Sequence, residues 1–201
     1  MKEFLEQFEK NLSNFVDETK KMKEEFLKRM KVKKKAPEAG DTVTISDIEW
    51  LILEKTEDVY YAITKDFIDL DMKFDEDKND WRTSELREYL NGEFLEGLEE
   101  EMLMEFERNL ISLDGQTEYG SCFDKVSMLT VDEYRKYRKL LQNTDKWWWM
   151  ITPWSTPCNG RERSVTVVSP SGNIYYFFCN NYCFGVRPFC IFKSSIFESG
   201  E

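Results

Sequence analysis

The aromatic segment near the end of the sequence constrains the fold most. It begins with Trp147-Trp148-Trp149 and ends with Phe184-Gly185-Val186-Arg187-Pro188. Residues 164–176 between them are β-branched and aromatic around a Ser-Pro-Ser-Gly turn, which predicts strand, turn and strand. Adjacent residues of a strand point to opposite faces of a sheet. We therefore expect at least one of the three tryptophans in a core, and favour two.

The charge is divided unevenly along the 201 residues, whose formal net charge is −11. Residues 1–35 hold 11 basic and 7 acidic side chains, and the remaining residues hold 17 and 32. The main body is therefore strongly acidic. An acidic body repels nucleic acid and anionic membranes and suits a partner with a basic surface. We expect a protein partner, without direct contact to nucleic acid or membrane.

The absence of histidine limits the chemistry open to the chain. Ser–His and Cys–His nucleophilic systems are excluded, so the sequence predicts no enzyme, no cofactor and no metal site. The cysteines are Cys122, Cys158, Cys179, Cys183 and Cys190. An odd number with irregular spacing fits neither a disulfide framework nor a zinc site, and predicts buried free thiols. With no signal peptide and no apolar run of ~20 residues, a cytoplasmic location is expected.

Residues 1–35 predict one long amphipathic helix. Its apolar positions recur at three- and four-residue steps, which is typical of a coiled-coil seam with a polar break at Thr19. Two alternatives remain open: the seam packs on the chain's own body, or it pairs with a second copy as a homodimer. Residues 36–41 form a linker, and residues 42–201 form the main domain.

The sequence of the main domain predicts alternating short strands and helices, and therefore an α+β fold. Helix 83–90 has Thr83 or Ser84 as its cap, and the capped helix after Thr130 runs to about Leu141. Residues 66–80 predict an acidic loop. The other expected elements are strands at 42–45, 48–54, 59–64 and 124–129 and a second helix at 94–106.

Five motifs occur in a recognisable order, at residues 48–53, 81–91, 124–130, 147–149 and 185–188. Over residues 41–192 the chain resembles an uncharacterised bacterial and prophage domain family with a W-W-L-R-S-P … G-x-V … G-V-R-P signature. The resemblance implies a C-type-lectin-like fold, which the formylglycine-generating enzymes and retroelement variable proteins share. It also implies a buried, structural role for Arg187, and we expect Trp148 to be structural as well.

Two regions have the composition of a recognition surface. Residues 154–163 and 175–182 mix tryptophan, tyrosine, asparagine and arginine, and the resemblance implies that such loops display the ligand-binding face. The alternative is that they are ordinary loops. The candidate partner-binding residues here are Trp154, Asn159, Arg161, Arg163, Tyr175, Asn180, Asn181 and Tyr182. A glutamate-rich segment adds Glu99, Glu100 and Glu101 as a second candidate interface.

These observations favour a non-catalytic protein-binding module. In its sharpest form the hypothesis is a phage or mobile-element protein that binds a host protein and inhibits a nucleic-acid-binding defence enzyme, like an acidic anti-CRISPR inhibitor. One alternative is a displayed receptor-binding protein of the retroelement variable-protein type. Another is a copper-dependent oxidase of the formylglycine-generating type, which would use Cys179 and Cys183.

Overall fold

The computed structural model describes residues 15–16, 18–23, 36–68 and 72–197. The chain divides into two units, Met1–Ala36 with Phe197–Glu201, and Pro37–Ile196. In the first unit the described residues 15–16 and 18–23 are helical, and Phe15 and Met22 are exposed. The rest of the helix predicted over residues 1–35 lies outside the described residues.

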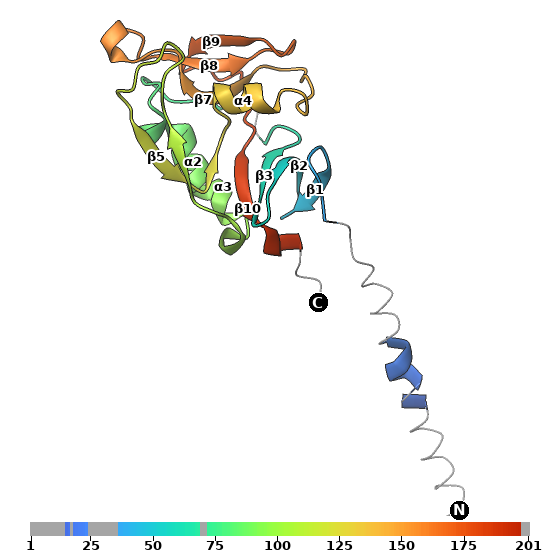
Figure 1. Ribbon diagram of the computed structural model, residues 1–201. Coiled ribbons are helices and arrows are strands. Elements are labelled where there is room, and N and C mark those ends of the chain that lie inside the picture. The colour runs from blue at the N-terminus through green and yellow to red at the C-terminus, as the bar shows by residue number, and fades with distance from the viewer. Residues whose placement is uncertain (1–14, 17, 24–35, 69–71, 198–201) are drawn as a thin grey trace, which may run out of the picture. The chain divides into compact units, whose positions relative to one another are not determined.

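The second unit is built around a five-stranded antiparallel sheet (Figure 1). Its strands, in spatial order, are β1 (Thr42–Ile45), β2 (Ile48–Lys55), β3 (Val59–Thr64), β10 (Phe189–Lys193) and β6 (Val126–Ser127). The predicted β2–β3 hairpin is confirmed, with Trp50 paired to Thr64 and Lys55 to Tyr60. The turn between β1 and β2 is formed by Ser46 and Asp47, both at positive φ. The strand predicted over residues 124–129 is shorter, because only β6 pairs with β10.

A second antiparallel sheet contains β7 (Trp148–Pro153), β8 (Ser164–Val168) and β9 (Ile174–Phe178), with β9 at one edge. The strand–turn–strand prediction for this segment is confirmed. A separate two-stranded ribbon joins β4 (Phe106–Asn109) to β5 (Ser121–Asp124). Antiparallel sheets with short helices establish the predicted α+β class.

The helices are short and well capped. They are η1 (Trp81–Thr83), α2 (Glu85–Asn91), α3 (Glu93–Glu96), η2 (Glu100–Met102), α4 (Val131–Tyr137), η3 (Pro157–Asn159) and η4 (Ser194–Phe197). Of the two predicted caps, Ser84 is the one used, since its Oγ accepts the Arg87 N–H at 3.2 Å. Thr130 and Glu133 form a capping box at the start of α4. Among the described residues, no helix is both long and apolar enough for a bilayer span.

The prediction of a second helix over residues 94–106 is wrong. α3 ends at Glu96, η2 is a single turn, and β4 begins at Phe106. Between them the chain runs extended beside β10: Leu103 bridges Phe192, and the Met104 N–H donates to the Ile191 carbonyl at 2.8 Å. Glutamates three and four positions apart repel one another in a helix, and Gly97 disfavours continuation, so pairing with β10 prevails.

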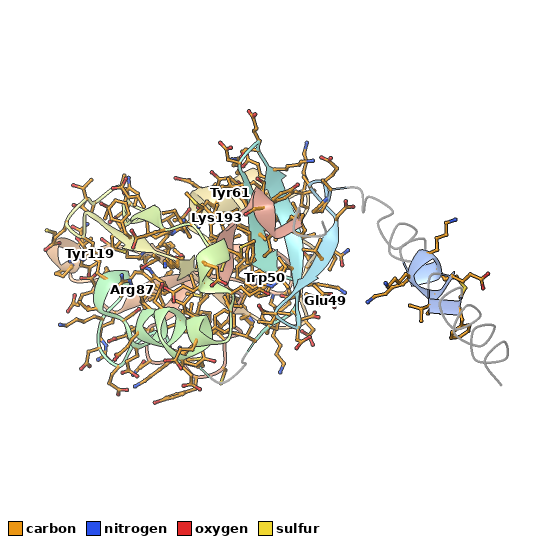
Figure 2. All side chains as sticks on the ribbon, turned by 90° about the horizontal axis from the view of Figure 1, so that it is seen from below. Glu49, Trp50, Tyr61, Arg87, Tyr119 and Lys193 are labelled. Carbon is orange, nitrogen blue, oxygen red and sulfur yellow. The ribbon has the colours of Figure 1, made fainter. Side chains whose placement is uncertain are left out.

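Tryptophans dominate the core of the second unit. Trp50, Trp81, Trp148 and Trp149 are all buried, so two of the three consecutive tryptophans are core residues, as favoured. Trp148 contacts Tyr134 of α4 at a centroid distance of 5.7 Å, and Trp149 contacts Phe184 at 4.7 Å. Both tryptophans are buried because both faces of β7 are covered. Figure 2 shows side chains filling the space around Trp50 and the neighbouring strands.

Candidate functional site

The most distinctive surface of the second unit is the edge strand β9. Tyr175, Tyr176, Phe177 and Phe178 follow one another along it and are 48%, 41%, 37% and 61% exposed. Single exposed apolar residues are ordinary, but a contiguous exposed group marks an interaction surface. An edge strand also presents backbone N–H and C=O groups to any approaching chain. β9 therefore presents aromatic rings and a sheet edge at one place.

The four rings divide between the two faces of the sheet, as strand alternation requires. Tyr175 and Phe177 lie on the face that carries Trp147, at centroid distances of 5.2 and 5.3 Å. Tyr176 lies on the other face and packs against Trp154, with the ring centroids 4.2 Å apart and the rings tilted by 35°. The structure thus brings Trp154 and Tyr176 together and separates them from the candidate residue Tyr175.

The face that carries Trp154 continues into the loop before β8. Phe178 and residues 160–164 line a small open hollow of about 190 Å³, and Arg161 and Arg163 are among its exposed walls. We call Trp154, Tyr176, Phe178, Arg161 and Arg163 the β9 face. Its aromatic and arginine side chains are the types that dominate protein interfaces.

Asn79 holds the loop of the β9 face in place. Its side chain is fully buried, and Nδ2 donates to the carbonyl oxygens of Ser155 at 2.8 Å and Ser164 at 2.7 Å. The Tyr119 hydroxyl donates to Asn79 Oδ1 at 2.7 Å. A buried amide with its hydrogen bonds satisfied rigidifies the segment around it. Sequence reasoning missed Asn79, because it lies in the predicted acidic loop.

Asn159 has a supporting position in the same loop. Its Nδ2 donates to Asp114 Oδ2 at 3.0 Å and to Ser155 Oγ at 3.2 Å. The hydroxyls of Ser112 and Ser155 donate to Asp114 and lower the pKa of that carboxyl below its usual value. Asn159 is exposed but engaged in this network, so it positions the loop.

Arg163 and Tyr182 converge on one neighbouring segment. Arg163 Nη2 donates to the Glu76 carbonyl at 3.1 Å. Lys73 pairs with the Glu76 carboxylate at 2.6 Å and lies over the Tyr182 ring at 5.8 Å. Asn180 and Asn181 precede Tyr182 and are half-buried; the Asn181 N–H donates to the Phe178 carbonyl. Asn180, Asn181 and Tyr182 therefore border the β9 face, to which Arg163 belongs.

Glu99, Glu100 and Glu101 are exposed but lie elsewhere. They follow α3, which in Figure 1 lies well below the β7–β8–β9 sheet. Glu100 pairs with Lys125 at 2.7 Å, and the Glu101 carbonyl accepts from Lys193 Nζ at 2.6 Å. The two candidate interfaces are therefore separate surfaces.

Arg187 and Trp148 lie in the core, next to each other. The guanidinium is 5.4 Å from the Trp148 ring centroid, and it donates to the Thr64 carbonyl from Nε at 3.0 Å and Nη2 at 2.8 Å. Nη2 also donates to the Lys65 carbonyl at 3.0 Å. Burial lowers the pKa of Arg187 to about 10. The guanidinium joins the end of β3 to the segment before β10.

The cysteines differ in exposure. Cys179 and Cys190 are buried, as expected, but Cys158 and Cys183 are exposed, so the prediction of buried thiols is wrong for those two. Cys158 lies in the single turn η3 and Cys183 in the loop before Phe184, where few side chains cover them. The Glu118 carboxylate, which accepts from Cys158 Sγ, raises the pKa of that thiol, and burial raises the pKa of Cys190.

The β9 face is thus the candidate site, and the hydrogen bonds of Asn79 and Asn159 hold its loop in position. Comparisons of the chain with protein-family models, with curated proteins and with solved structures find no match.

Proposed function

We propose that the chain is a non-catalytic protein-binding module that contacts its partner through the β9 face. The observation that carries this proposal is that Tyr176 and Phe178, 41% and 61% exposed, lie on one face of an edge strand beside Trp154. Aromatic rings supply a large contact area for little lost conformational freedom, and arginines fit around them. Asn79 and Asn159 hold the loop in shape, so the face is preorganised, which lowers the entropic cost of binding.

The chemistry of the side chains supports a binding role. The sequence has no histidine to serve as a general base. Burial raises the pKa of Cys122 to about 11, and Cys158, Cys179 and Cys190 also have raised pKa values. Thiols held in the protonated form are poor nucleophiles and poor ligands. Cys179, one of the two cysteines that the copper-dependent oxidase would use, is among these thiols, which argues against that alternative.

The fold assignment that accompanies this proposal is a C-type-lectin-like domain. Short, irregular antiparallel sheets with flanking helices support it, as does the buried Arg187 in the Gly-Val-Arg-Pro segment. In that fold the loops beside the last strands would form the ligand-binding face. The β9 face lies in this part of the chain.

The acidic body favours a partner with a basic surface. In its most specific form, the chain is a phage or mobile-element protein that covers the nucleic-acid-binding surface of a host defence nuclease. Glu99, Glu100 and Glu101 would then add long-range attraction from a second surface. Inhibition that weakens as salt is raised, measured across a panel of nucleases, tests this form; unchanged activity of every nuclease would remove it.

The role of the β9 face is tested by comparing captured proteins between variants. A Tyr176→Ser/Phe178→Ser variant should lose a partner that the wild-type protein retains from a bacterial lysate. Phe123→Ser is the matched control, since Phe123 is 58% exposed on β5 in a different sheet. Loss of the partner only with the β9 variant supports the proposal. Equal retention by both variants, or equal loss, would contradict it.

A further inference from the structure

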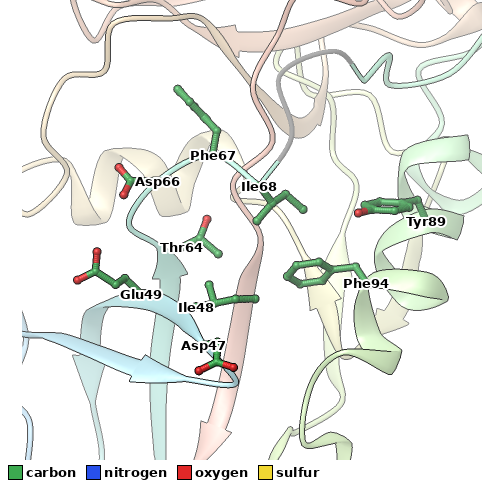
Figure 3. Close-up of a pocket in the computed structure, with 9 residues that line it drawn as sticks. All are labelled: Asp47, Ile48, Glu49, Thr64, Asp66, Phe67, Ile68, Tyr89 and Phe94. Carbon is green, nitrogen blue, oxygen red and sulfur yellow. The ribbon is translucent and has the colours of Figure 1, made fainter.

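A hollow of about 490 Å³ opens on the second unit, apart from the residues of the β9 face (Figure 3). On one side are the β1–β2 turn, the start of β2 and the end of β3, and on the other are Tyr89 of α2 and Phe94 of α3. Its volume lies within the range of small-molecule sites.

The hollow has an acidic rim. Asp47, Glu49 and Asp66 contribute carboxylates to it. Glu49 pairs with Lys65 at 2.9 Å, whereas Asp47 and Asp66 form no ion pair with a described residue. The guanidinium of Arg187 donates to the carbonyl oxygens of Thr64 and Lys65. Lys65 and Arg187 both interact electrostatically with Asp66 and offset part of its charge. The three carboxylates outnumber these two cations, so the rim keeps a net negative charge that favours a cation.

The rest of the lining is apolar and aromatic. Ile48, Phe67, Ile68, Tyr89 and Phe94 provide it. Aromatic faces attract cations, and apolar walls suit the hydrocarbon chain that carries one. The walls are preformed: the Ile68 N–H donates to the Val186 carbonyl at 3.0 Å, and Phe67 packs so closely on Gly185 that a Cβ there would lie 2.3 Å from the ring.

Thr64 adds an independent sign of a ligand. The residue is 1% exposed, and its hydroxyl has no hydrogen-bond partner among the described residues. In Figure 3 the oxygen points toward the space between Asp66 and Phe67. A buried polar atom without a partner costs free energy, and a donor group on a ligand would satisfy it.

A metal ion does not fit this arrangement. Within the part of the chain that the structure describes, no three acidic or cysteine side chains gather closely enough to hold one. Carboxylates spread around an aromatic lining suit a larger cation instead. We propose that the hollow binds an organic cation, an ammonium or guanidinium group on a short apolar chain. The source is either a free amine or a basic side chain of a protein.

The binding test uses agmatine, a four-carbon chain with a guanidinium at one end and an ammonium at the other. N-butylurea has the same chain length and neither charged group, so it is the uncharged comparison. Titration of the full-length 15N-labelled protein with agmatine should shift the amide signals around residues 47–49 and 64–68, and n-butylurea should not shift them. Equal shifts with both compounds, or no shift with agmatine, would overturn the proposal.

Conservative variants locate the site. Asp47→Asn and Asp66→Asn should each raise the dissociation constant of agmatine by about two- to fivefold, in line with exposed charge pairs. Asparagine tolerates the positive φ of residue 47, so the turn is kept. Asp58→Asn is the matched control, since Asp58 is an exposed aspartate at the opposite end of the β2–β3 hairpin. An equal effect of the control would refute the assignment.

Thr64→Val tests the hydroxyl without changing charge or shape. It should weaken agmatine binding by about two- to tenfold, the value of one hydrogen bond, while the midpoint of thermal unfolding stays the same or rises. Unchanged affinity in this variant would contradict the part assigned to Thr64.

The two sources are separated with a capped Gly-Arg-Gly peptide and its citrulline analogue. Binding of the arginine peptide at least tenfold more tightly than agmatine identifies a protein side chain as the ligand, and similar affinities identify the free amine. Binding of the citrulline peptide as tightly as the arginine peptide would overturn the proposal. The Tyr176→Ser/Phe178→Ser variant should bind agmatine with the affinity of the wild-type protein. The cation-binding proposal and the proposed role of the β9 face are therefore tested independently.

Discussion

Arg108 is a charged side chain in the core of the second unit, only 2% exposed. Its Nη1 and Nη2 donate to the two carboxylate oxygens of Glu133 at 2.7 and 2.6 Å, and Nη2 donates to the Met128 carbonyl at 2.8 Å. Burial alone would raise the pKa of Glu133, but the hydrogen bonds and charge of Arg108 outweigh it and lower that pKa. The pair ties β4 to the start of α4.

This pair predicts a loss of stability in acid. Because the folded pKa of Glu133 is lowered, its contribution is present above the unfolded pKa of about 4.3 and is lost as pH falls through the folded value. Urea unfolding followed between pH 6 and pH 3 should show this decline. In Glu133→Gln the dependence on pH should be shallower, and stability at pH 6 should drop by about 3 kcal/mol because Arg108 stays buried without its partner. An unchanged pH profile would contradict the assignment.

Gly185 offers a second prediction at the scale of single residues. A Cβ at this position would lie 2.3 Å from Cδ1 of Phe67, so Gly185→Ala displaces the ring. We expect a loss of about 1–3 kcal/mol in the free energy of unfolding, as for other overpacked sites. Gly115→Ala provides a contrast, because no atom lies near its Cβ and only its positive φ resists alanine. Thermal melts should show Gly185→Ala as the more damaging change if the contact with Phe67 dominates.

Some site residues are visible in the sequence and others are not. Trp154, Arg161 and Arg163 are recognisable by type, since aromatic and basic residues in a glycine- and proline-containing loop predict a recognition surface. Asn79 is not recognisable, because an asparagine among aspartates looks like part of a solvated loop. Only the folded chain places its amide against three carbonyl oxygens that lie more than 70 positions away.

Elements were predictable where local chemistry decides them. The β2–β3 hairpin and the capped start of α4 follow from alternation and from Thr130 with Glu133. Residues 97–105 show the limit of this reasoning. Their apolar spacing suits a helix, yet Leu103 and Met104 pair with β10, which lies about 90 positions away and leaves no local signal. Tertiary pairing overrides helix propensity there.

The cap of α4 supports a prediction at the scale of elements. Thr130 Oγ1 accepts the Glu133 N–H at 3.1 Å, so Thr130→Ala should lower the free energy of unfolding by about 1–2 kcal/mol. Thr83→Ala is the control, since Thr83 is exposed and Ser84 provides the cap of α2. That change should stay within about 0.5 kcal/mol in urea titrations. Similar losses in both variants would show that the cap is not what stabilises α4.

At the scale of the whole molecule, the division into two units is open to a direct test. Pro37–Ile196 forms a unit with its own core, so a chain that begins at Pro37 should still unfold cooperatively. Light scattering of both chains then decides between the alternatives for residues 1–35. A dimer that becomes a monomer on shortening supports pairing through the predicted seam, and a monomer in both cases excludes it. Loss of the cooperative transition in the shortened chain would contradict the independence of the second unit.

β10 lies inside the sheet between β3 and β6, although the ribosome adds it after every other described strand. A nascent chain therefore emerges with β3 unpaired on that side and with Trp50 lacking the Phe192 ring, which later sits 5.0 Å away. The exposed aromatic residues of β9 have already left the ribosome at that stage, because β9 precedes β10 in the chain. Chains stopped by a nonsense codon before Phe189 should consequently aggregate or engage chaperones, since folding waits for the closing strand.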